Sequence, residues 1–196
     1  MKKQAHFNPK SFKWVISLVV MIVISAGVIF GSKAIDDMAN KKYNEPVEIG
    51  FTIESTKDVD ISSMNTAGYN VKSVQEAYDA SNQLVAYIVE LTTIGYNQEV
   101  PIEMTSIISA DGTLVCGIDI LHQEETEYLG VRIETPEFKD KFTGRYLPVV
   151  LSTSTTKGST IDVLSNSTIS SQAVVDGVNN AQSFVAENFV TEDTAE

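Results

Sequence analysis

The chain has 196 residues, a length that fits one domain plus an anchoring segment. With 43% hydrophobic and 20% charged residues it is typical of a globular protein, which argues against a disordered chain. Its net charge of −12 argues against a nucleic-acid partner, because phosphates are bound through clusters of Lys and Arg.

The N-terminus is predicted to be a membrane anchor. No acidic residue precedes Asp36, whereas four lysines lie within the first 13 residues. Residues 14–31 carry no charge, and as a helix they would span roughly 27 Å, close to the thickness of a bilayer core. The preceding lysines indicate the cytoplasmic side. We therefore expect a cytoplasmic N-terminus at 1–13, a transmembrane helix at 14–31 in contact with lipid, and an extracytoplasmic remainder.

A cleaved signal peptide is the alternative, because its basic start has the same appearance. The apolar run is longer than the usual hydrophobic region of a signal peptide, and no Ala-x-Ala site follows it closely. A retained anchor is favoured, which predicts a single-pass protein of the cell membrane. The one cysteine, Cys116, excludes an internal disulfide and a multi-cysteine metal centre, and its apolar surroundings predict a buried strand residue.

The segment after the anchor is the least clear. Residues 32–45 have helical spacing and predict a juxtamembrane helix that Pro46 ends. Residues 47–71 mix strand and loop signals without a clear order. Beyond them, β-branched and apolar runs predict five strands, at 84–91, 102–109, 114–121, 146–152 and 160–163. A tight turn at 110–113 joins the second strand to the third.

Two helices complete the expected domain. Residues 137–142 follow Pro136, which is favoured at a helix start. Residues 170–188 form the clearest helix, with one apolar stripe made by Val174, Val178, Ala181 and Val185. The order of elements predicts an α+β fold with a small antiparallel sheet and segregated helices. The expected divisions are an N-terminal part at 32–83, the main domain at 84–188 and an acidic tail at 189–196.

One segment has the pattern of an anion site. Residues 161–174 run from a strand, through small polar residues, into the long helix. The first N–H groups of a helix have no internal partner, and the helix dipole favours a phosphate there. Ser165, Ser167, Thr168 and Ser170 offer hydroxyls, and Asn166 tolerates a left-handed backbone. An ordinary N-cap would have the same composition. The spaced glycines and the lysine of a P-loop are absent from the segment.

These residues resemble the flavinylation motif of the FMN-binding domain family, which includes the G subunit of the Rnf electron-transport complex and the C subunit of the Na+-translocating NADH:quinone reductase. The motif matches at Asp162, Ser165, Thr168 and Ser170, with Asn166-Ser167 in place of the family's Gly-Ala pair. Further matches occur upstream in the family's order, at Gly95-Tyr96, Asp111-Gly112, Gly117, His122, Glu125-Thr126 and Leu129-Gly130.

The resemblance implies that 84–188 is an FMN-binding domain whose flavin phosphate is esterified to Thr168 by a flavin transferase. It also implies two groups of cofactor-binding residues, one around Thr168 and one near the flavin ring: Asp162, Ser165, Asn166, Ser167, Ile169 and Ser170, and Thr126, Leu129 and Gly130. Arg132 is a candidate for balancing the phosphate charge. Tyr128, which stands where the family has glycine, is a candidate for stacking on the ring. No residue is predicted to be catalytic, and His122 has no ligand spacing for a metal.

By the same resemblance, the chain is expected to be an electron-transfer subunit of an Rnf-type, ion-translocating oxidoreductase that links ferredoxin and NAD. Its partners would be the other membrane subunits, and it would not catalyse a reaction alone. No nicotinamide-binding Gly-rich turn is visible, so NADH would react on another subunit. Two alternatives stay open, namely a stand-alone anchored flavoprotein for extracellular electron transfer and a structural ectodomain that has lost its flavin.

Overall fold

The computed structural model describes residues 44–190. The expected cytoplasmic segment, the transmembrane helix at 14–31 and all but the last residues of the juxtamembrane helix lie outside this part of the chain, as does most of the acidic tail. Within residues 44–190 no helix combines the length and the hydropathy needed to cross a bilayer. The chain divides into two compact units at residues 42 and 43, and the description below concerns the second.

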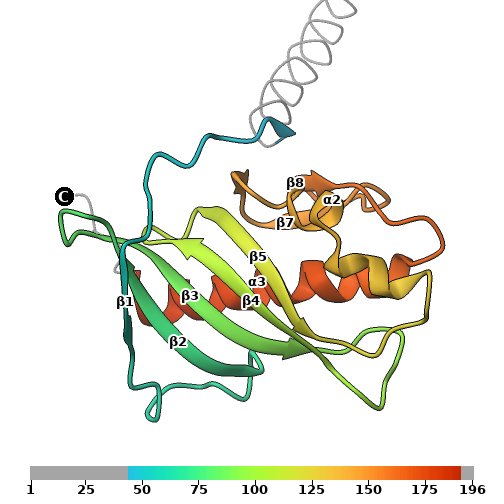
Figure 1. Cartoon of the computed structure of the whole chain (residues 1–196), viewed down its shortest axis with the longest axis horizontal. Helices are drawn as coiled ribbons and strands as arrows, with labels where there is room; N and C mark the ends of the chain where they lie inside the picture. The colour runs from blue at the N-terminus through green and yellow to red at the C-terminus, as the bar shows by residue number, and fades with distance from the viewer. Residues whose placement is uncertain (1–43, 191–196) are drawn as a thin grey trace, which may run out of the picture. The chain divides into compact units, whose positions relative to one another are not determined.

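A six-stranded antiparallel sheet forms the centre of this unit (Figure 1). Its strands are neighbours in the sheet in the order in which they occur along the chain, so no crossover connection is needed. They are β1 (Ser55–Asp58), β2 (Val71–Tyr78), β3 (Leu84–Thr93), β4 (Ile102–Ser109), β5 (Leu114–His122) and β6 (Arg145–Tyr146).

The remaining elements follow β5 and lead to the long helix α3 (Thr168–Asn188), which packs against β3 and β4. A 3₁₀ helix η1 (Gly130–Glu134) and a short helix α2 (Pro136–Lys139) come first. After β6, two short strands, β7 (Val149–Leu151) and β8 (Ser159–Ile161), pair in parallel as a separate ladder. The antiparallel sheet and the one main helix agree with the α+β class expected from the sequence.

Several boundaries agree with expectation and others do not. The strand predicted at 102–109 has the same bounds as β4, and β3 and β5 extend past their predicted ends by one or two residues. The strand predicted at 146–152 is wrong as one element. Pro148 has no N–H to donate to a ladder, so the chain leaves the main sheet there and begins the parallel pair. α2 is shorter than the helix predicted at 137–142.

Strand β2 was not predicted, because its sequence VKSVQEAY lacks strict alternation. A register irregularity lies between Val71 and Ser73, and it breaks the period-two pattern. Strand β1 is exposed along its whole length, so it has no buried face that would give its sequence an alternating hydrophobic pattern. Both strands belong to the region expected to be the N-terminal part of the outer domain, and they extend the sheet that contains β3.

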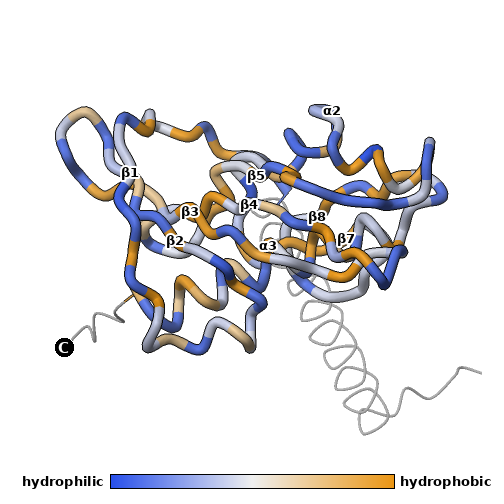
Figure 2. Tube along the Cα trace, turned by 60° about the horizontal axis from the view of Figure 1, so that its bottom comes forward, coloured by the Kyte–Doolittle hydropathy of each residue, from blue (hydrophilic) through white to orange (hydrophobic). Residues whose placement is uncertain are grey.

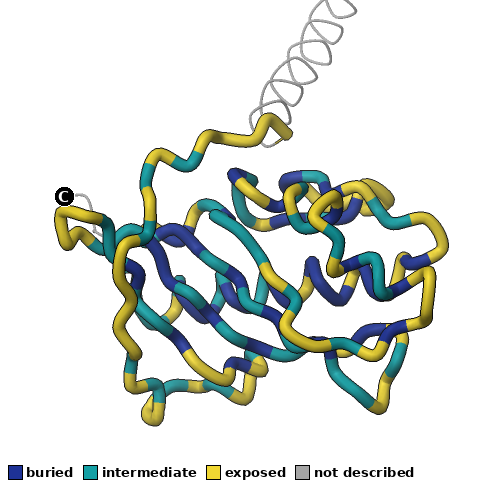
Figure 3. The backbone as a smooth tube through the Cα atoms, viewed as in Figure 1, coloured by how far each residue is buried: buried dark blue, intermediate teal, exposed yellow. Residues whose placement is uncertain are grey.

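The core lies between α3 and the inner face of the sheet. Figure 2 shows hydrophobic residues recurring along α3 and the central strands, and Figure 3 shows the same elements as the most buried. The predicted stripe of α3 is fully buried, and along β4 Ile102, Met104 and Ile108 alternate with partly exposed residues. A Cβ on Gly177 would lie 2.5 Å from the sulfur of Met104, so α3 approaches β4 closely at this point.

Ser106 introduces a polar group into this core. It lies on the inner face of β4 with no solvent exposure, and among the described residues its hydroxyl has no hydrogen-bond partner. We expect Ser106→Ala to raise the free energy of unfolding by about 1 kcal/mol, because the desolvation cost of an unpaired hydroxyl is removed. Urea denaturation at an unchanged m-value would measure this. Ser73→Ala on the exposed face of β2 is the contrasting variant: its hydroxyl donates to Glu90 at 3.1 Å, so its removal should bring no gain in stability. A lower midpoint for Ser106→Ala would contradict the expectation.

Cys116 lies in β5, as predicted, but is partly rather than fully buried. Burial, with the nearby charge of Asp111, raises the pKa of its thiol to about 12. The thiolate is the nucleophilic form, so the raised pKa disfavours reaction of this cysteine at neutral pH and agrees with a packing role.

Candidate functional site

The N-terminal end of α3 is built by the predicted segment. The helix begins at Thr168, two residues earlier than expected. Asn166 has φ +62°, the left-handed conformation that its side chain was expected to tolerate. The N-cap residue Ser167 makes no side-chain capping hydrogen bond, and the Thr168 side chain is exposed. The first-turn N–H groups of this 21-residue helix therefore lack a side-chain cap and can bind an anion.

A cavity of about 420 Å³ opens at this helix end, within the range of roughly 300–1,000 Å³ that is usual for small-molecule sites. Three chain segments line it: the loop after β3, the loop after β5 and the start of α3. The lining residues are Tyr96, Thr126, Leu129, Gly130, Asn166, Ser167, Thr168, Ile169 and Ser170.

Eight of the ten residues predicted to bind a cofactor are among these lining residues. The other two, Asp162 and Ser165, are exposed and lie outside the lining. Tyr96 lines the cavity but was not predicted as a site residue, although the Gly95-Tyr96 pair belonged to the upstream matches. Tyr96 is 62% exposed, so no burial signal in the sequence could have indicated it.

Glu125 lies directly behind the cavity wall and is only 6% exposed. Its carboxylate accepts hydrogen bonds from the backbone N–H groups of Tyr96 and Asn97, at 3.0 and 3.1 Å, and from the Ser170 hydroxyl at 2.5 Å. It thus contacts two of the lining segments while belonging to the third. Glu125 is one of the upstream matches to the family pattern, but it was not predicted to belong to the site.

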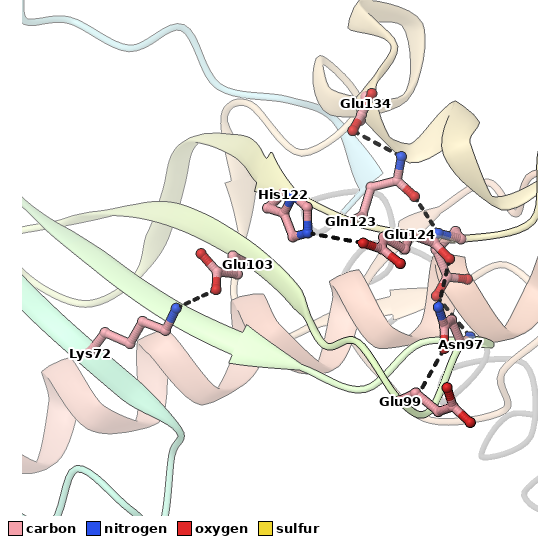
Figure 4. A network of polar contacts seen from close by, with 9 residues as sticks. Lys72, Asn97, Glu99, Glu103, His122, Gln123, Glu124 and Glu134 are labelled. Carbon is pink, nitrogen blue, oxygen red and sulfur yellow. Dashed lines mark hydrogen bonds and ion pairs between the residues drawn. The ribbon is translucent and has the colours of Figure 1, made fainter.

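The loop that carries Glu125 is held from both sides, as the contacts in Figure 4 show. The Asn97 side-chain amide donates to the carbonyl of Glu124 at 2.9 Å. On the other side, Gln123 donates to the carboxylate of Glu134 in η1 at 3.0 Å. These bonds fix the loop after β5 relative to the loop after β3 and to η1.

Arg132 brings a positive charge to the start of α3. It lies in η1 rather than in a strand, and its guanidinium donates to the Leu129 carbonyl at 3.1 Å, to the Ser165 carbonyl and to the Ser167 hydroxyl at 3.4 Å. The guanidinium therefore connects the loop after β5 to the turn that precedes α3. Together with the helix dipole it favours a bound anion at this end of the cavity.

Comparison with known proteins identifies the family. The family model described as FMN-binding domain matches residues 95–183, a range that contains every residue lining the cavity. Residues 95–183 thus belong to the FMN-binding domain family. The fold of the chain agrees with that assignment. Over 72% of this chain and 80% of the other, it superposes on the C subunit of the Na(+)-translocating NADH-quinone reductase from Parabacteroides distasonis, with a TM-score of 0.53 and 22% identity. Shewanella oneidensis NqrC gives a TM-score of 0.52 at 17% identity, over 60% of this chain and 58% of that one.

Two curated relatives of this FMN-binding domain protein are named as G subunits of ion-translocating complexes. The G subunit of the ion-translocating oxidoreductase complex of Methanosarcina acetivorans is 34% identical over 125 residues, which is 64% of each chain. The G subunit of the Na(+)-translocating ferredoxin:NAD(+) oxidoreductase complex of Acetobacterium woodii is 33% identical over 141 residues, 68% of this chain and 66% of the relative. The chain thus spans slightly under two thirds of the length of each relative.

In this FMN-binding domain, Tyr128 has a left-handed backbone with φ +63° and is 80% exposed. It is not among the residues that line the cavity. A left-handed conformation costs a residue with a Cβ about 1–2 kcal/mol, and glycine avoids that cost. The glycine that the family has at this position thus suits the observed backbone better than tyrosine does.

We expect Tyr128→Gly to raise the free energy of unfolding by about 1 kcal/mol, because it removes this strain while little packing is lost. Thermal or chemical denaturation would measure the change. Tyr128→Ala is the matched control, since it removes the ring but keeps the Cβ, and its stability should stay near that of the wild type. Equal gains for the alanine and glycine variants would rule out backbone strain as the cause.

The described part of the FMN-binding domain offers no metal centre. Among residues 44–190 no three His, Cys, Asp or Glu residues are grouped so that they could hold an ion. His122 lies 3.9 Å from the Glu124 carboxylate, on an exposed surface.

Proposed function

We propose that the cavity at the start of α3 holds FMN and that the flavin phosphate is joined to the chain by an ester to the Thr168 hydroxyl. The observation that carries this proposal is that residues 166–170 and the loop after β5 line one and the same cavity of about 420 Å³. The donor chemistry also suits a flavin phosphate: an uncapped helix end, the Arg132 guanidinium beside it and an exposed Thr168 side chain.

When bound, FMN supplies the redox chemistry, and the chain's own residues supply position and electrostatics. The first turn of α3 and Arg132 would hold the phosphate. Thr126, Leu129 and Gly130 would form another part of the wall, where an exposed Leu129 and a glycine permit a flat ring to approach the backbone. The covalent bond would keep the cofactor in place on an extracytoplasmic domain. A flavin transferase would form it from a flavin dinucleotide: the Thr168 oxygen would bond to the phosphorus that carries riboflavin, the diphosphate bond would break, the nucleoside monophosphate would leave and the hydroxyl proton would pass to solvent.

At the level of the assembly, we propose that the chain is the flavin-carrying subunit of an Rnf-type, ion-translocating oxidoreductase, with electrons flowing between ferredoxin and NAD. Support comes from the two curated relatives, which are named as G subunits of ion-translocating oxidoreductase complexes, one of them a ferredoxin:NAD(+) oxidoreductase. The uncharged run at 14–31 would anchor it beside the other membrane subunits, with the N-terminus in the cytoplasm.

Purification of the tagged full chain from its native membranes would test the assembly. Co-purification of iron–sulfur and integral membrane subunits in fixed stoichiometry is the expected result. A flavinylated chain recovered alone under gentle solubilisation would favour a stand-alone flavoprotein for extracellular electron transfer. A chain without covalent flavin, despite a competent transferase, would favour the structural ectodomain.

A further inference from the structure

The carboxylate of Glu125 joins the three segments that line the FMN cavity. Oε2 accepts from the backbone N–H of Tyr96, and Oε1 accepts from that of Asn97, both in the loop after β3. Oε2 also accepts the hydroxyl of Ser170 in the first turn of α3. Ser170 is 45 residues away along the chain, so this bond is a long-range tertiary contact.

Three hydrogen-bond donors take the place of water around the buried carboxylate of Glu125. Removing a carboxylate from water costs several kcal/mol unless donors replace its hydration. Glu125 has three such donors, and among the described residues no Lys or Arg forms a salt bridge with it. The hydrogen-bond donors that stabilise its charge belong to the segments that line the cavity. The position of the Glu125 side chain and the positions of these segments therefore depend on one another.

Two glycines leave room for this side chain. A Cβ on Gly95 would lie 2.2 Å from Oε1 of Glu125, and a Cβ on Gly130 would lie 2.6 Å from Cβ of Glu125 and 2.8 Å from the Ser170 hydroxyl. These distances are far shorter than a normal van der Waals contact. The backbones of the two loops therefore lie directly against Glu125, and any shift of its side chain moves a wall of the cavity.

We propose that Glu125 is the positioning residue of the FMN site, and this inference rests on the proposed attachment of flavin to Thr168. Through Ser170 the carboxylate fixes the first turn of α3, and Thr168 lies in that same turn. Through Tyr96 and Asn97 it fixes the facing loop. Glu125 itself is not among the residues that line the cavity, so its effect on flavin attachment passes through its hydrogen-bond partners, of which Ser170 lies in the same helical turn as Thr168.

The test measures covalent FMN incorporation into the purified full-length chain by a flavin transferase, for Glu125→Gln, Ser170→Ala and the double variant. Each single substitution is expected to lower kcat about tenfold, with little change in the KM for this chain. The double variant should be no slower than the slower single variant, because Ser170→Ala only removes a hydrogen bond that Glu125→Gln has already disrupted. Glu124→Gln, next to Glu125 and exposed, should incorporate flavin at the wild-type rate.

The kcat and KM values separate positioning from loss of fold. This chain is the substrate of the transferase. Partial unfolding lowers the concentration of folded substrate and so raises the apparent KM at unchanged kcat, whereas a misplaced Thr168 hydroxyl lowers kcat. If Glu125→Gln does not fold, the comparison of Ser170→Ala with Ser170→Thr replaces it, and the threonine hydroxyl should restore at least half of the wild-type kcat. Effects of the two single variants that multiply in the double variant, or wild-type kcat in Glu125→Gln, would overturn the inference. Absence of FMN on the wild-type chain would instead overturn the proposed function.

Discussion

Thr168→Val is expected to abolish covalent FMN on this chain. Valine has nearly the shape of threonine but no hydroxyl, so no ester with the flavin phosphate can form. Thr168 is exposed at the first position of α3, and the change in the free energy of unfolding should stay within about 0.5 kcal/mol. Intact mass after co-expression with a flavin transferase would show the unmodified chain, and the fluorescent band on a denaturing gel would be lost.

Thr168→Ser is the matched control for this result. It keeps a hydroxyl at the same position, so an FMN mass increment less one water should remain. An increment that persists in Thr168→Val would mean that another hydroxyl is the acceptor, and peptide mapping would distinguish Ser165, Ser167 and Ser170. Of these, Ser170 is buried and donates to Glu125, which makes it the least accessible of the three.

Gly130→Ala is expected to reduce FMN incorporation at least about fivefold. The added Cβ would lie 2.6 Å from Cβ of Glu125, an atom fixed next to its backbone that cannot rotate away. Overpacking of this kind costs about 1–3 kcal/mol, and each 1.36 kcal/mol taken from correct placement of the acceptor is a factor of about ten in rate. Incorporation kinetics with the purified chain would measure the loss, and circular dichroism would report whether the domain remains folded.

Gly117→Ala provides the control for this substitution. Gly117 lies in β5, and the nearest atom to an added Cβ is Cδ1 of Ile107 at 3.8 Å, an ordinary contact. Flavin incorporation and stability should therefore remain near wild-type values. Wild-type incorporation in Gly130→Ala would show that the wall between the loop after β5 and α3 can open without loss, contrary to the packing described above.

Elements with a regular buried face were predictable from the sequence. The spacing of four, three and four residues in α3 indicated one apolar stripe, and all four of its residues are buried. In β4 inward and outward residues alternate over most of the strand, and its bounds were predicted without error. In both elements burial and periodicity carry the same information, because one face of the element covers the core.

Elements with an interrupted pattern were not predictable in the same way. The irregularity after Val71 concealed β2, and the exposed β1 had no buried face to reveal it. The parallel pair of β7 and β8 depends on partners that no local pattern identifies.

An anion site at residues 165–170 was predictable from the sequence, because a helix N-terminus, its hydroxyls and the left-handed Asn166 are adjacent along the chain and need no other segment. What only the tertiary structure decided is that Tyr96 and the loop from Thr126 to Gly130 meet that helix end across one cavity, with Glu125 bonded to Ser170 behind it. Contacts between residues so far apart in the chain depend on how the sheet packs against α3. The sequence pattern of either segment alone therefore cannot predict them.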